Sequence, residues 1–211
     1  MYIAIEGVIG VGKTTLARML KPAFNADILL EVFEENPFLS DFYGDRARYA
    51  FQTQIFFLLS RYHQQKKSVP EMLSQTPNLF SDYTFAKDAL FASINLVGDE
   101  LEMYRRVHEA LAEKIRHPDL LVYLRAETET LMARIAMRDR PYERDMDSSY
   151  ISALGKAYDD FFSKPYNNTP VLTIAADNLD FVRNPEDLVY IQVQIEAALK
   201  QTPLQPELLD S

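Results

Sequence analysis

The sequence lacks or is poor in several residue types, and each shortage excludes a class of protein or site. Its 211 residues contain no cysteine, which excludes disulfide bonds, thiolate catalysis and cysteine-based zinc sites. The longest uninterrupted apolar run, residues 55–59, is far below the roughly 20 residues that cross a bilayer. Basic side chains number 22 against 31 acidic ones, and a net charge of −9 disfavours binding to a nucleic-acid backbone. We therefore expect neither a membrane span nor a nucleic-acid partner.

The amino-terminal residues have no basic region and no small-residue cleavage site ahead of an apolar stretch, so we expect no secretion signal and a cytoplasmic protein. The length and a hydrophobic fraction of 47% predict one globular domain over residues 1–211. Residues 202–211 hold two prolines and little periodicity, and we expect them to form a loosely held tail.

Short aliphatic runs alternate with longer segments of helical period, which is the pattern of an α/β protein with a parallel sheet covered by helices on both faces. Five strands are predicted, at residues 2–6, 28–32, 79–83, 120–124 and 171–175. Helices are predicted at residues 13–20, 46–66, 85–96, 100–116, 128–138, 148–162 and 185–200.

Three of the six glycines fall within nine residues, in Gly7-Val8-Ile9-Gly10-Val11-Gly12-Lys13-Thr14-Thr15. The segment matches G-x-x-x-x-G-K-[ST] between a predicted strand and a predicted helix, which is the context of a phosphate-binding loop. Backbone N–H groups and the helix N-terminus would surround the phosphates, Lys13 would reach the outer ones, and the Thr14 hydroxyl would ligate Mg²⁺. A glycine turn that only packs a strand on a helix would need neither the lysine nor the hydroxyl. We expect a nucleoside triphosphate here.

A phosphate-binding loop alone does not distinguish kinases from GTPases or ATP-driven motors. The sequence has no Asn-Lys-x-Asp motif that reads guanine, and no hydrophobic strand ends in the Asp-Glu pair typical of ATPase motors. These two absences favour a kinase.

Glu31 ends the second predicted strand. Ligands of an open α/β sheet bind at the carboxyl ends of its strands, so this side chain should lie near the phosphate-binding loop. A carboxylate there would orient an acceptor hydroxyl and take its proton, and it would repel an acceptor that already carries phosphate. This favours a neutral alcohol over a nucleoside monophosphate. The sequence alone leaves open that Glu31 only caps or pairs with a nearby cation.

Three further features are each open to two interpretations. Gln52 shares a helical stripe with Phe56 and Leu59, where a buried amide either bonds to backbone or reads a base edge. Asp82 lies at the end of the third predicted strand, where it either holds Mg²⁺ or caps the next helix. An arginine cluster lies on the predicted helix 128–138 and just after it, and it forms either a solvated face or a lid over transferring phosphates. Its members are Arg134, Arg138, Arg140 and Arg144.

Together these features resemble the deoxynucleoside kinase family, and most closely its bacterial deoxyadenosine and deoxyguanosine kinases. The resemblance covers residues 2 to about 185. It rests on residues 5–15, on Glu31 before Glu35-Asn36-Pro37-Phe38-Leu39, on Phe51-Gln52-Thr53, on Ser81-Asp82-Tyr83, and on Arg134, Arg138, Arg140 and Glu143.

The resemblance implies a P-loop kinase fold, with a five-stranded parallel sheet, eight or nine helices and an arginine-bearing lid. It implies transfer of the γ-phosphate of ATP to the 5′-hydroxyl of a deoxynucleoside, with a purine base favoured, in nucleotide salvage. Mg²⁺ would be the cofactor. The assembly would be a homodimer through a helix bundle, for which residues 100–116 are our candidate.

The resemblance also implies a role for each matching residue. Glu31 would be the general base, acting with Lys13, Arg138 and Arg140. ATP would be bound by Gly7, Gly10, Gly12, Lys13, Thr14, Thr15, Arg134 and Arg138, with an adenine loop near residues 178–183. Tyr43 and Glu143 would hold the sugar 3′-hydroxyl, Gln52 would pair with the base and Phe91 would stack on it. Thr14 and Asp82 would hold the metal.

Two departures from the family pattern leave roles open. Many members carry an arginine directly after the acidic residue of the third strand, where it steadies the catalytic base, but this chain has Tyr83 there. Either Lys87 or Arg48 would have to supply the charge. The following segment is also one residue shorter than in those relatives, so Lys87 and Asp88 compete for the acidic position that selects the base.

Two other functions compete with this interpretation. The first is a nucleoside monophosphate kinase of the thymidylate type, which would need a basic site for the acceptor phosphate. The second is a regulatory module that binds ATP without transferring phosphate. The sequence does not decide which base is preferred.

Overall fold

The computed structural model describes residues 1–164, 166 and 168–201, so the expected tail at 202–211 lies outside the described residues. Five parallel strands form one sheet in the order β2-β3-β1-β4-β5. The strands are β1 (Tyr2–Glu6), β2 (Ala26–Leu29), β3 (Asn78–Ser81), β4 (Leu120–Arg125) and β5 (Val171–Ala175). The prediction of five strands in an α/β fold is confirmed.

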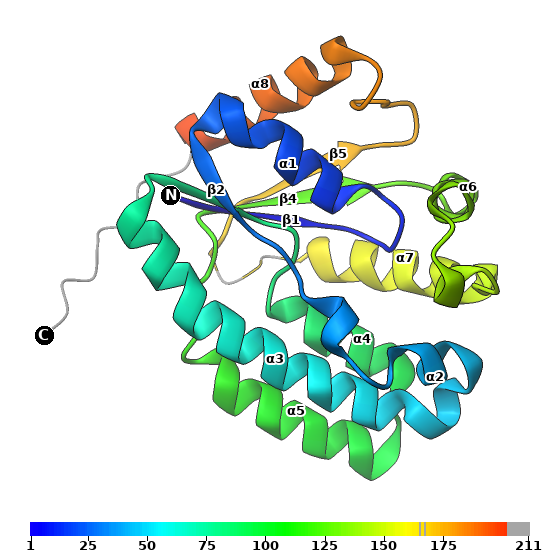
Figure 1. Ribbon diagram of the computed structural model, residues 1–211. Coiled ribbons are helices and arrows are strands. Elements are labelled where there is room, and N and C mark those ends of the chain that lie inside the picture. Colours follow the sequence, from blue (N-terminus) through cyan, green and yellow to red (C-terminus); the bar gives the residue numbers. More distant parts are fainter. Residues whose placement is uncertain (165, 167, 202–211) are drawn as a thin grey trace, which may run out of the picture.

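The central strand β1 is buried along its whole length because helices cover both faces of the sheet. The helices α1 (Lys13–Phe24) and α8 (Pro185–Gln201) lie on one face. On the other face lie α3 (Arg46–Gln75), α4 (Ala86–Asn95), α5 (Gly98–Ala112) and α7 (Ser148–Phe162), as Figure 1 shows. In the described residues, no helix combines the length and the apolar character that a membrane span requires.

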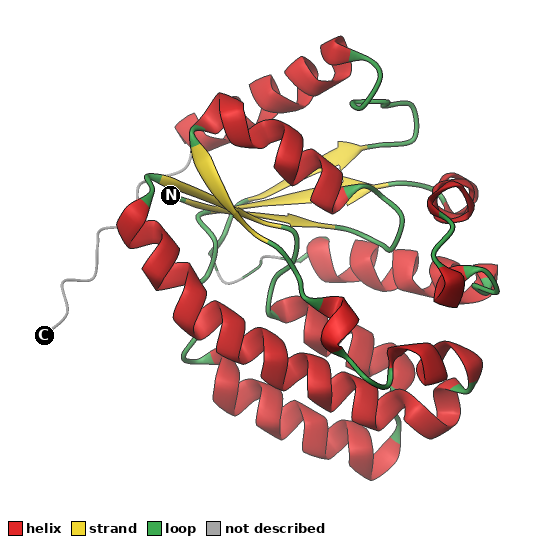
Figure 2. Cartoon of the chain, in the orientation of Figure 1, coloured by secondary structure: helices red, strands yellow, loops and turns green. Residues whose placement is uncertain are grey.

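Strand order reverses at β1, because β3 and β2 extend the sheet on one side of it and β4 and β5 on the other. A crevice at the carboxyl edge of such a sheet is the usual ligand site. The loops that leave β1 and β4 both emerge at this edge (Figure 2). The edge is flanked by α2 (Leu39–Gly44) and by α6 (Thr128–Arg138), and two short 3₁₀ helices, Phe33–Glu35 and Pro141–Glu143, lie beside them.

Several predicted boundaries are wrong. Strands β2 and β3 end at Leu29 and Ser81, so Glu31 and Asp82 lie in the loops that follow the strands rather than on them. Helix α3 continues nine residues past the predicted end at residue 66, and Pro70 lies inside it at an exposed position. Helix α5 ends at Ala112 rather than at residue 116, and the six-residue α2 was too short to give a periodic signal.

Candidate active site

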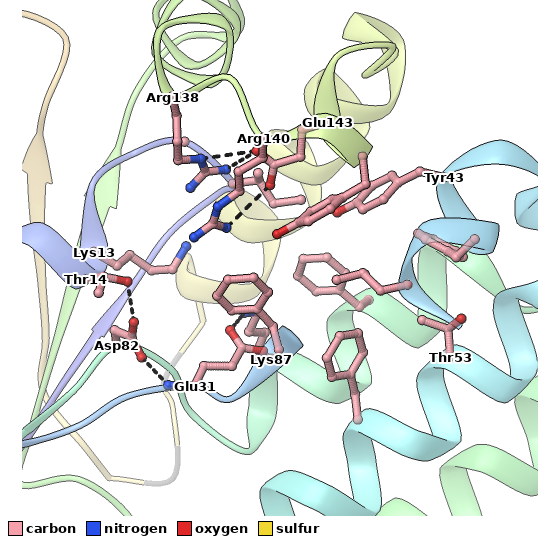
Figure 3. A pocket seen from close by; sticks show the side chains of 18 of the residues that line it. Lys13, Thr14, Glu31, Tyr43, Thr53, Asp82, Lys87, Arg138, Arg140 and Glu143 are labelled. Atoms are coloured by element: carbon pink, nitrogen blue, oxygen red, sulfur yellow. Dashed lines mark hydrogen bonds and ion pairs between the residues drawn. The ribbon is translucent and has the colours of Figure 1, made fainter. Parts of the chain in front are cut away.

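A pocket of about 340 Å³ opens at the carboxyl edge of the sheet, and residues from distant parts of the chain line it (Figure 3). Most of the site residues expected from the sequence are among them. They are Gly10, Gly12, Lys13, Thr14, Thr15, Glu31, Tyr43, Asp82, Phe91, Arg138, Arg140 and Glu143. The sequence therefore identified one spatial cluster.

The phosphate-binding loop requires glycine for steric reasons. Gly7 has φ +148°, and a Cβ there would collide with the carbonyl oxygen of Leu124, so β4 packs directly against the loop. Gly12 has φ +105°, and a Cβ there would lie 2.9 Å from the ring of Phe181. Both positions combine the left-handed backbone region with close contacts, so only glycine fits without displacement.

Lys13 lies at the start of α1 with its ammonium group facing the pocket. Its Nζ donates hydrogen bonds to the carbonyl oxygens of Gly7 at 2.6 Å and Val8 at 3.2 Å. Burial lowers the pKa of Lys13 to about 8, and the neighbouring Lys87 adds to this effect. Glu6, Glu31 and Asp82 act in the opposite direction.

Arg134 does not line the pocket, although it connects parts of the donor region. Its guanidinium group donates to the carbonyl oxygens of Val11 at 3.3 Å, Ala176 at 2.7 Å and Leu179 at 3.1 Å. These bonds fix the phosphate-binding loop to the segment that follows β5, where we expected the adenine loop. A direct contact between Arg134 and ATP stays a prediction.

Asp82 joins the phosphate-binding loop to the segment that carries Glu31. Its Oδ1 accepts a hydrogen bond from the Glu31 backbone N–H at 2.8 Å, and its Oδ2 accepts one from the Thr14 hydroxyl. The side chain makes no cap for α4. A carboxylate beside a threonine hydroxyl is a suitable oxygen-donor set for Mg²⁺, which takes only one or two carboxylates and completes its shell with phosphate and water. Among the described residues, no cluster of three His, Cys, Asp or Glu exists that would hold a metal alone.

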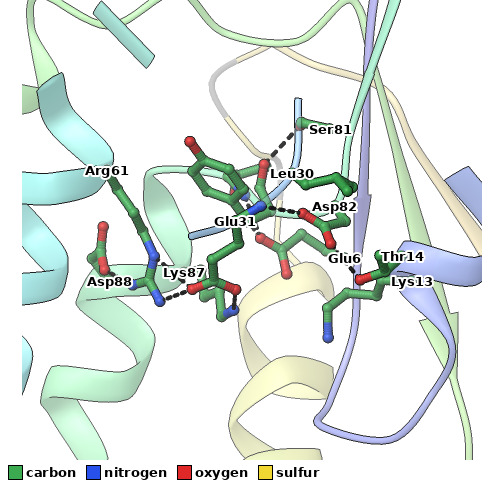
Figure 4. A network of polar contacts seen from close by, with 12 residues as sticks. Glu6, Lys13, Thr14, Leu30, Glu31, Arg61, Ser81, Asp82, Lys87 and Asp88 are labelled. Atoms are coloured by element: carbon green, nitrogen blue, oxygen red, sulfur yellow. Dashed lines mark hydrogen bonds and ion pairs between the residues drawn. The ribbon is translucent and has the colours of Figure 1, made fainter. Parts of the chain in front are cut away.

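Glu31 is held between two cations at the centre of a buried charge network (Figure 4). Arg61 on α3 donates from Nε to Glu31 Oε1 at 2.9 Å, and Lys87 on α4 donates from Nζ to Oε2 at 2.6 Å. A second nitrogen of Arg61 also bonds to Oε1, and its third pairs with Asp88, whose side chain is fully buried. Burial alone would raise the pKa of the Glu31 carboxyl, but Arg61 and Lys87 outweigh it and hold that pKa well below its usual range.

The structure places the residues named in the two open questions about this region. Arg48 is exposed and stacks on the ring of Tyr49, 5.2 Å from its centroid, so it does not reach the pocket. Of the two cations considered from the sequence, Lys87 is the one that contacts Glu31. Asp88 pairs with Arg61, and Arg61 lines the pocket. The Oδ2 of Asp88 has no hydrogen-bond partner among the described residues.

The expectation that Gln52 is buried is wrong. This side chain is exposed and does not line the pocket, and Leu59 on the same predicted stripe is 43% exposed. The buried amide that lines the pocket is Gln54, which is 2% exposed and whose Oε1 has no hydrogen-bond partner in the described part of the chain. The reason is helical phase. Gln54 lies seven residues, about two turns, before Arg61, so both side chains lie on the same face of α3. This spacing could have identified Gln54 as the glutamine that faces the pocket.

We define the lid as residues 128–144. Glu143 of the lid and Tyr43 of α2 both line the pocket. Glu143 is 4% exposed and accepts from Arg138 Nη2 at 2.5 Å, while Arg140 Nη1 lies 3.6 Å from its other oxygen. The Arg140 guanidinium also lies 4.3 Å from the ring centroid of Phe33. These two lid arginines thus face the pocket.

Some pocket residues were not expected from the sequence. Arg61, Phe57 and Phe33 all line the cavity, and the guanidinium carbon of Arg61 lies 4.4 Å from the Phe57 ring centroid. Phe91, which was expected, contacts Tyr158 edge-on at a centroid separation of 6.4 Å. The pocket thus combines a phosphate-binding loop, a paired carboxylate, lid arginines and an aromatic wall.

Comparison with known proteins agrees with this geometry. Residues 3–200 match the family model described as deoxynucleoside kinase. The chain is 34% identical over 198 residues to a deoxyguanosine kinase of Bacillus subtilis, covering 92% of this chain and 96% of that protein. It is 34% identical over 178 residues to a deoxyadenosine kinase of Dictyostelium discoideum, covering 82% of this chain and 71% of that protein.

A solved structure of the deoxyadenosine kinase from M. mycoides, with the products dCMP and a flexible dCDP bound, superposes with a TM-score of 0.81 at 26% identity. The match covers 93% of this chain and 100% of that one. A second structure of that kinase, with bound dATP, superposes with a TM-score of 0.80. The model match over nearly the whole chain and the relatives above 30% identity establish that this chain belongs to the deoxynucleoside kinase family.

Proposed function

We propose that this chain transfers the γ-phosphate of ATP to the 5′-hydroxyl of a purine deoxynucleoside. The single observation that carries the proposal is the presence of Glu31 and the phosphate-binding loop in one pocket. A carboxylate opposite the triphosphate accepts a hydrogen bond from an uncharged alcohol, and it repels an acceptor that already bears a phosphate. The relatives named deoxyguanosine and deoxyadenosine kinases support the purine class.

Glu31 would act on the nucleophile. The low pKa of its carboxyl keeps it ionised at neutral pH, where it orients the 5′-hydroxyl toward the γ-phosphorus. As the new O–P bond forms and the bond from the γ-phosphorus to the bridging oxygen breaks, the hydroxyl proton passes to Glu31 and ADP leaves. A weak base is sufficient because the transition state of phosphoryl transfer is loose, and catalysis comes mainly from positioning and charge stabilisation.

Charge on the transferring group would be stabilised from two sides. Lys13 and the backbone N–H groups of the loop face the phosphates from the sheet edge, and Arg138 with Arg140 faces them from the lid. Thr14 and Asp82 would hold Mg²⁺, which when bound neutralises charge on the phosphate oxygens. Both arginines contact Glu143 in this structure, so the lid itself joins the phosphate-facing arginines to the carboxylate that we place at the sugar.

The nucleoside would lie between α2, α3 and α4. Tyr43 and Glu143 would hold the 3′-hydroxyl, and Phe91 would stack on the base. Gln54, whose amide oxygen has no partner within residues 1–164, 166 and 168–201, replaces Gln52 as the residue proposed to pair with the base. Arg61 and Asp88 would complete the polar end of this subsite.

The test is a panel of acceptors incubated with purified protein, ATP and Mg²⁺, with ADP release measured for each. We expect release with deoxyadenosine or deoxyguanosine and none with deoxynucleoside monophosphates, dTMP included. Turnover of the monophosphates alone would contradict the proposal and favour the thymidylate-type kinase. Tight ATP binding without ADP release for any acceptor would contradict it in favour of a non-catalytic module.

A further inference from the structure

Position 83, where the family resemblance implied an arginine, contributes no charge to the pocket. The Tyr83 ring is fully buried and packs with Leu29, Val69 and Leu79 in a small hydrophobic cluster. Its hydroxyl donates a hydrogen bond to Gln64 Oε1 at 2.6 Å. The side chain thus serves packing between the sheet and α3, and the site needs its second cation from elsewhere.

Lys87 provides a cation that is dedicated to Glu31. It lies in the first turn of α4, its side chain is 8% exposed, and its Nζ bonds to Glu31 Oε2 at 2.6 Å. Arg61 takes the other oxygen of the carboxylate but divides its guanidinium group between Glu31 and Asp88. Each carboxylate oxygen therefore has its own cation, and the two cations come from different helices.

The same ammonium group lies toward the phosphate-binding side of the pocket. Lys87 lines the same pocket as Lys13, and its charge is second only to burial among the causes that lower the pKa of Lys13. Figure 4 shows both lysine side chains directed to the space beside Glu31. The Phe91 ring, one turn further along α4, covers the Lys87 ammonium at 5.5 Å from the ring centroid. Lys87 is thus confined by the carboxylate and the ring.

We propose that Lys87 is a positioning residue for phosphoryl transfer: it holds Oε2 of the Glu31 carboxylate while Arg61 holds Oε1, and so fixes the orientation in which the carboxylate meets the 5′-hydroxyl. The inference rests on the proposed function and assigns to a lysine of α4 the steadying of the catalytic carboxylate. Lys87 acts through Glu31 and makes no bond to substrate. A carboxylate held at one oxygen by the shared Arg61 alone would rotate, and its misalignment would slow transfer without weakening nucleoside binding.

The first test replaces Lys87 by methionine, which keeps the length of the side chain and removes the charge. We expect kcat for the preferred deoxynucleoside to fall by about 10²-fold, while the dissociation constants of nucleoside and ATP stay within about twofold. Lys87→Arg should recover kcat to within about tenfold of the wild type. The matched control is Arg48→Met, which removes the exposed arginine that was the other candidate for this charge and should leave kcat unchanged.

The second test is a double-mutant cycle with Glu31→Gln. If Lys87 acts through Glu31, adding Lys87→Met to the Glu31→Gln variant should lower kcat by less than about threefold, because the group it positions is already gone. A loss of about 10²-fold that persists in the Glu31→Gln background would overturn the inference. So would a Lys87→Met variant with wild-type kcat, or a Lys87→Arg variant as slow as Lys87→Met.

Thermal midpoints and dissociation constants distinguish a loss of positioning from a loss of folding or of substrate binding. Glu31 keeps Arg61 as a partner in the Lys87 variants, so we expect their thermal midpoints to stay close to that of the wild type. Dissociation constants measured by calorimetry show directly that both substrates still bind. A wild-type protein that phosphorylates no deoxynucleoside contradicts the proposed function, whereas an active wild type with an equally active Lys87→Met variant contradicts only the role of Lys87.

Discussion

Gln52 and Gln54 lie two residues apart on α3 in opposite environments, and this contrast gives a matched pair of variants. Gln54 is 2% exposed in the pocket, and Gln52 is exposed outside it. Replacing Gln54 by leucine removes hydrogen bonds of about 1–3 kcal/mol to the base. We therefore expect KM for the nucleoside to rise about 10- to 100-fold, with KM for ATP unchanged.

Gln52→Leu is the control for this substitution, because it makes the same chemical change on the same helix. Its KM for the nucleoside should equal that of the wild type. Steady-state kinetics with the preferred deoxynucleoside distinguish the two. A large effect at Gln52 and none at Gln54 would show that the helical phase of α3 has been misassigned.

Lys13 gives the site an alkaline limit. Burial lowers the pKa of this ammonium group to about 8, with Lys87 adding to the shift and Glu6, Glu31 and Asp82 opposing it. The lysine is cationic below that pH and loses its charge as the pH rises through it. Because kcat/KM reports ionisations of the free enzyme, kcat/KM for ATP should fall about tenfold per pH unit above about 8.

The binding of ATP provides an independent measurement of this limit. The dissociation constant of ATP should rise between pH 7 and pH 9.5, and that of the nucleoside, which Lys13 does not bind, should change less. A dissociation constant for ATP that stays constant over this range would show that Lys13 remains charged in the free enzyme.

At the scale of elements, a buried ion pair joins α3 to α4. Arg61 is 5% exposed and Asp88 is fully buried. Removing one partner of a buried pair leaves an uncompensated charge, which costs about 3–5 kcal/mol. We expect Arg61→Met to lower the free energy of unfolding by about that amount in denaturant titrations, and the added change Asp88→Asn to restore part of it.

A surface ion pair on α5 provides the control for this experiment. Arg106 and Glu102 pair one turn apart with side chains 77% and 63% exposed. Exposed pairs contribute little, so Arg106→Met should leave the free energy of unfolding nearly unchanged. Equal destabilisation by the two arginine substitutions would show that the Arg61–Asp88 pair is solvated in solution.

The first and last residues of elements with strong local signals were predicted correctly from the sequence. The bounds of elements shaped by tertiary contacts were not. The bounds of β1, β5, α6 and α7 are confirmed. Asp147 caps the start of α7, and Asp139 ends α6 in the left-handed region at φ +50°. The phase of α3 was misjudged because apolar side chains surround most of that helix, so periodicity alone did not show which face meets the pocket.

The same distinction applies to the site. The phosphate-binding loop and Glu31 could be placed from motif and strand order, since parallel strands bring their carboxyl ends to one edge. The pairing of Arg61 with Asp88 and Glu31 could not, because it joins residues 27 and 30 positions apart through the packing of α3 against α4. The contact of Lys87 with Glu31, 56 positions apart, is equally a product of the fold.

At the scale of the whole molecule, α5 and the middle of α3 form the layer farthest from α1 and α8 (Figure 1). Large apolar side chains are exposed on this layer, with Met103 at 49%, Leu59 at 43% and Val97, just before α5, at 81%. Exposed large apolar side chains are frequent in protein contacts. We propose that this layer forms the homodimer interface expected from the family resemblance.

The prediction is that the wild type has the mass of two 24.3 kDa chains in light scattering, and that Met103→Glu converts it to a single chain. A buried, unpaired carboxylate opposes association strongly because it must lose its hydration at the interface. The matched control is Val189→Glu, at a valine 55% exposed on α8, because that helix lies on the opposite side of the molecule from α5 and should tolerate the charge. A dimer that survives Met103→Glu and dissociates with Val189→Glu would place the interface on α8, and a monomeric wild type would exclude the homodimer.

Because the pocket lies between α2, α3, α4 and the lid, a monomeric Met103→Glu variant that keeps its kcat would further show that each chain contains a complete site.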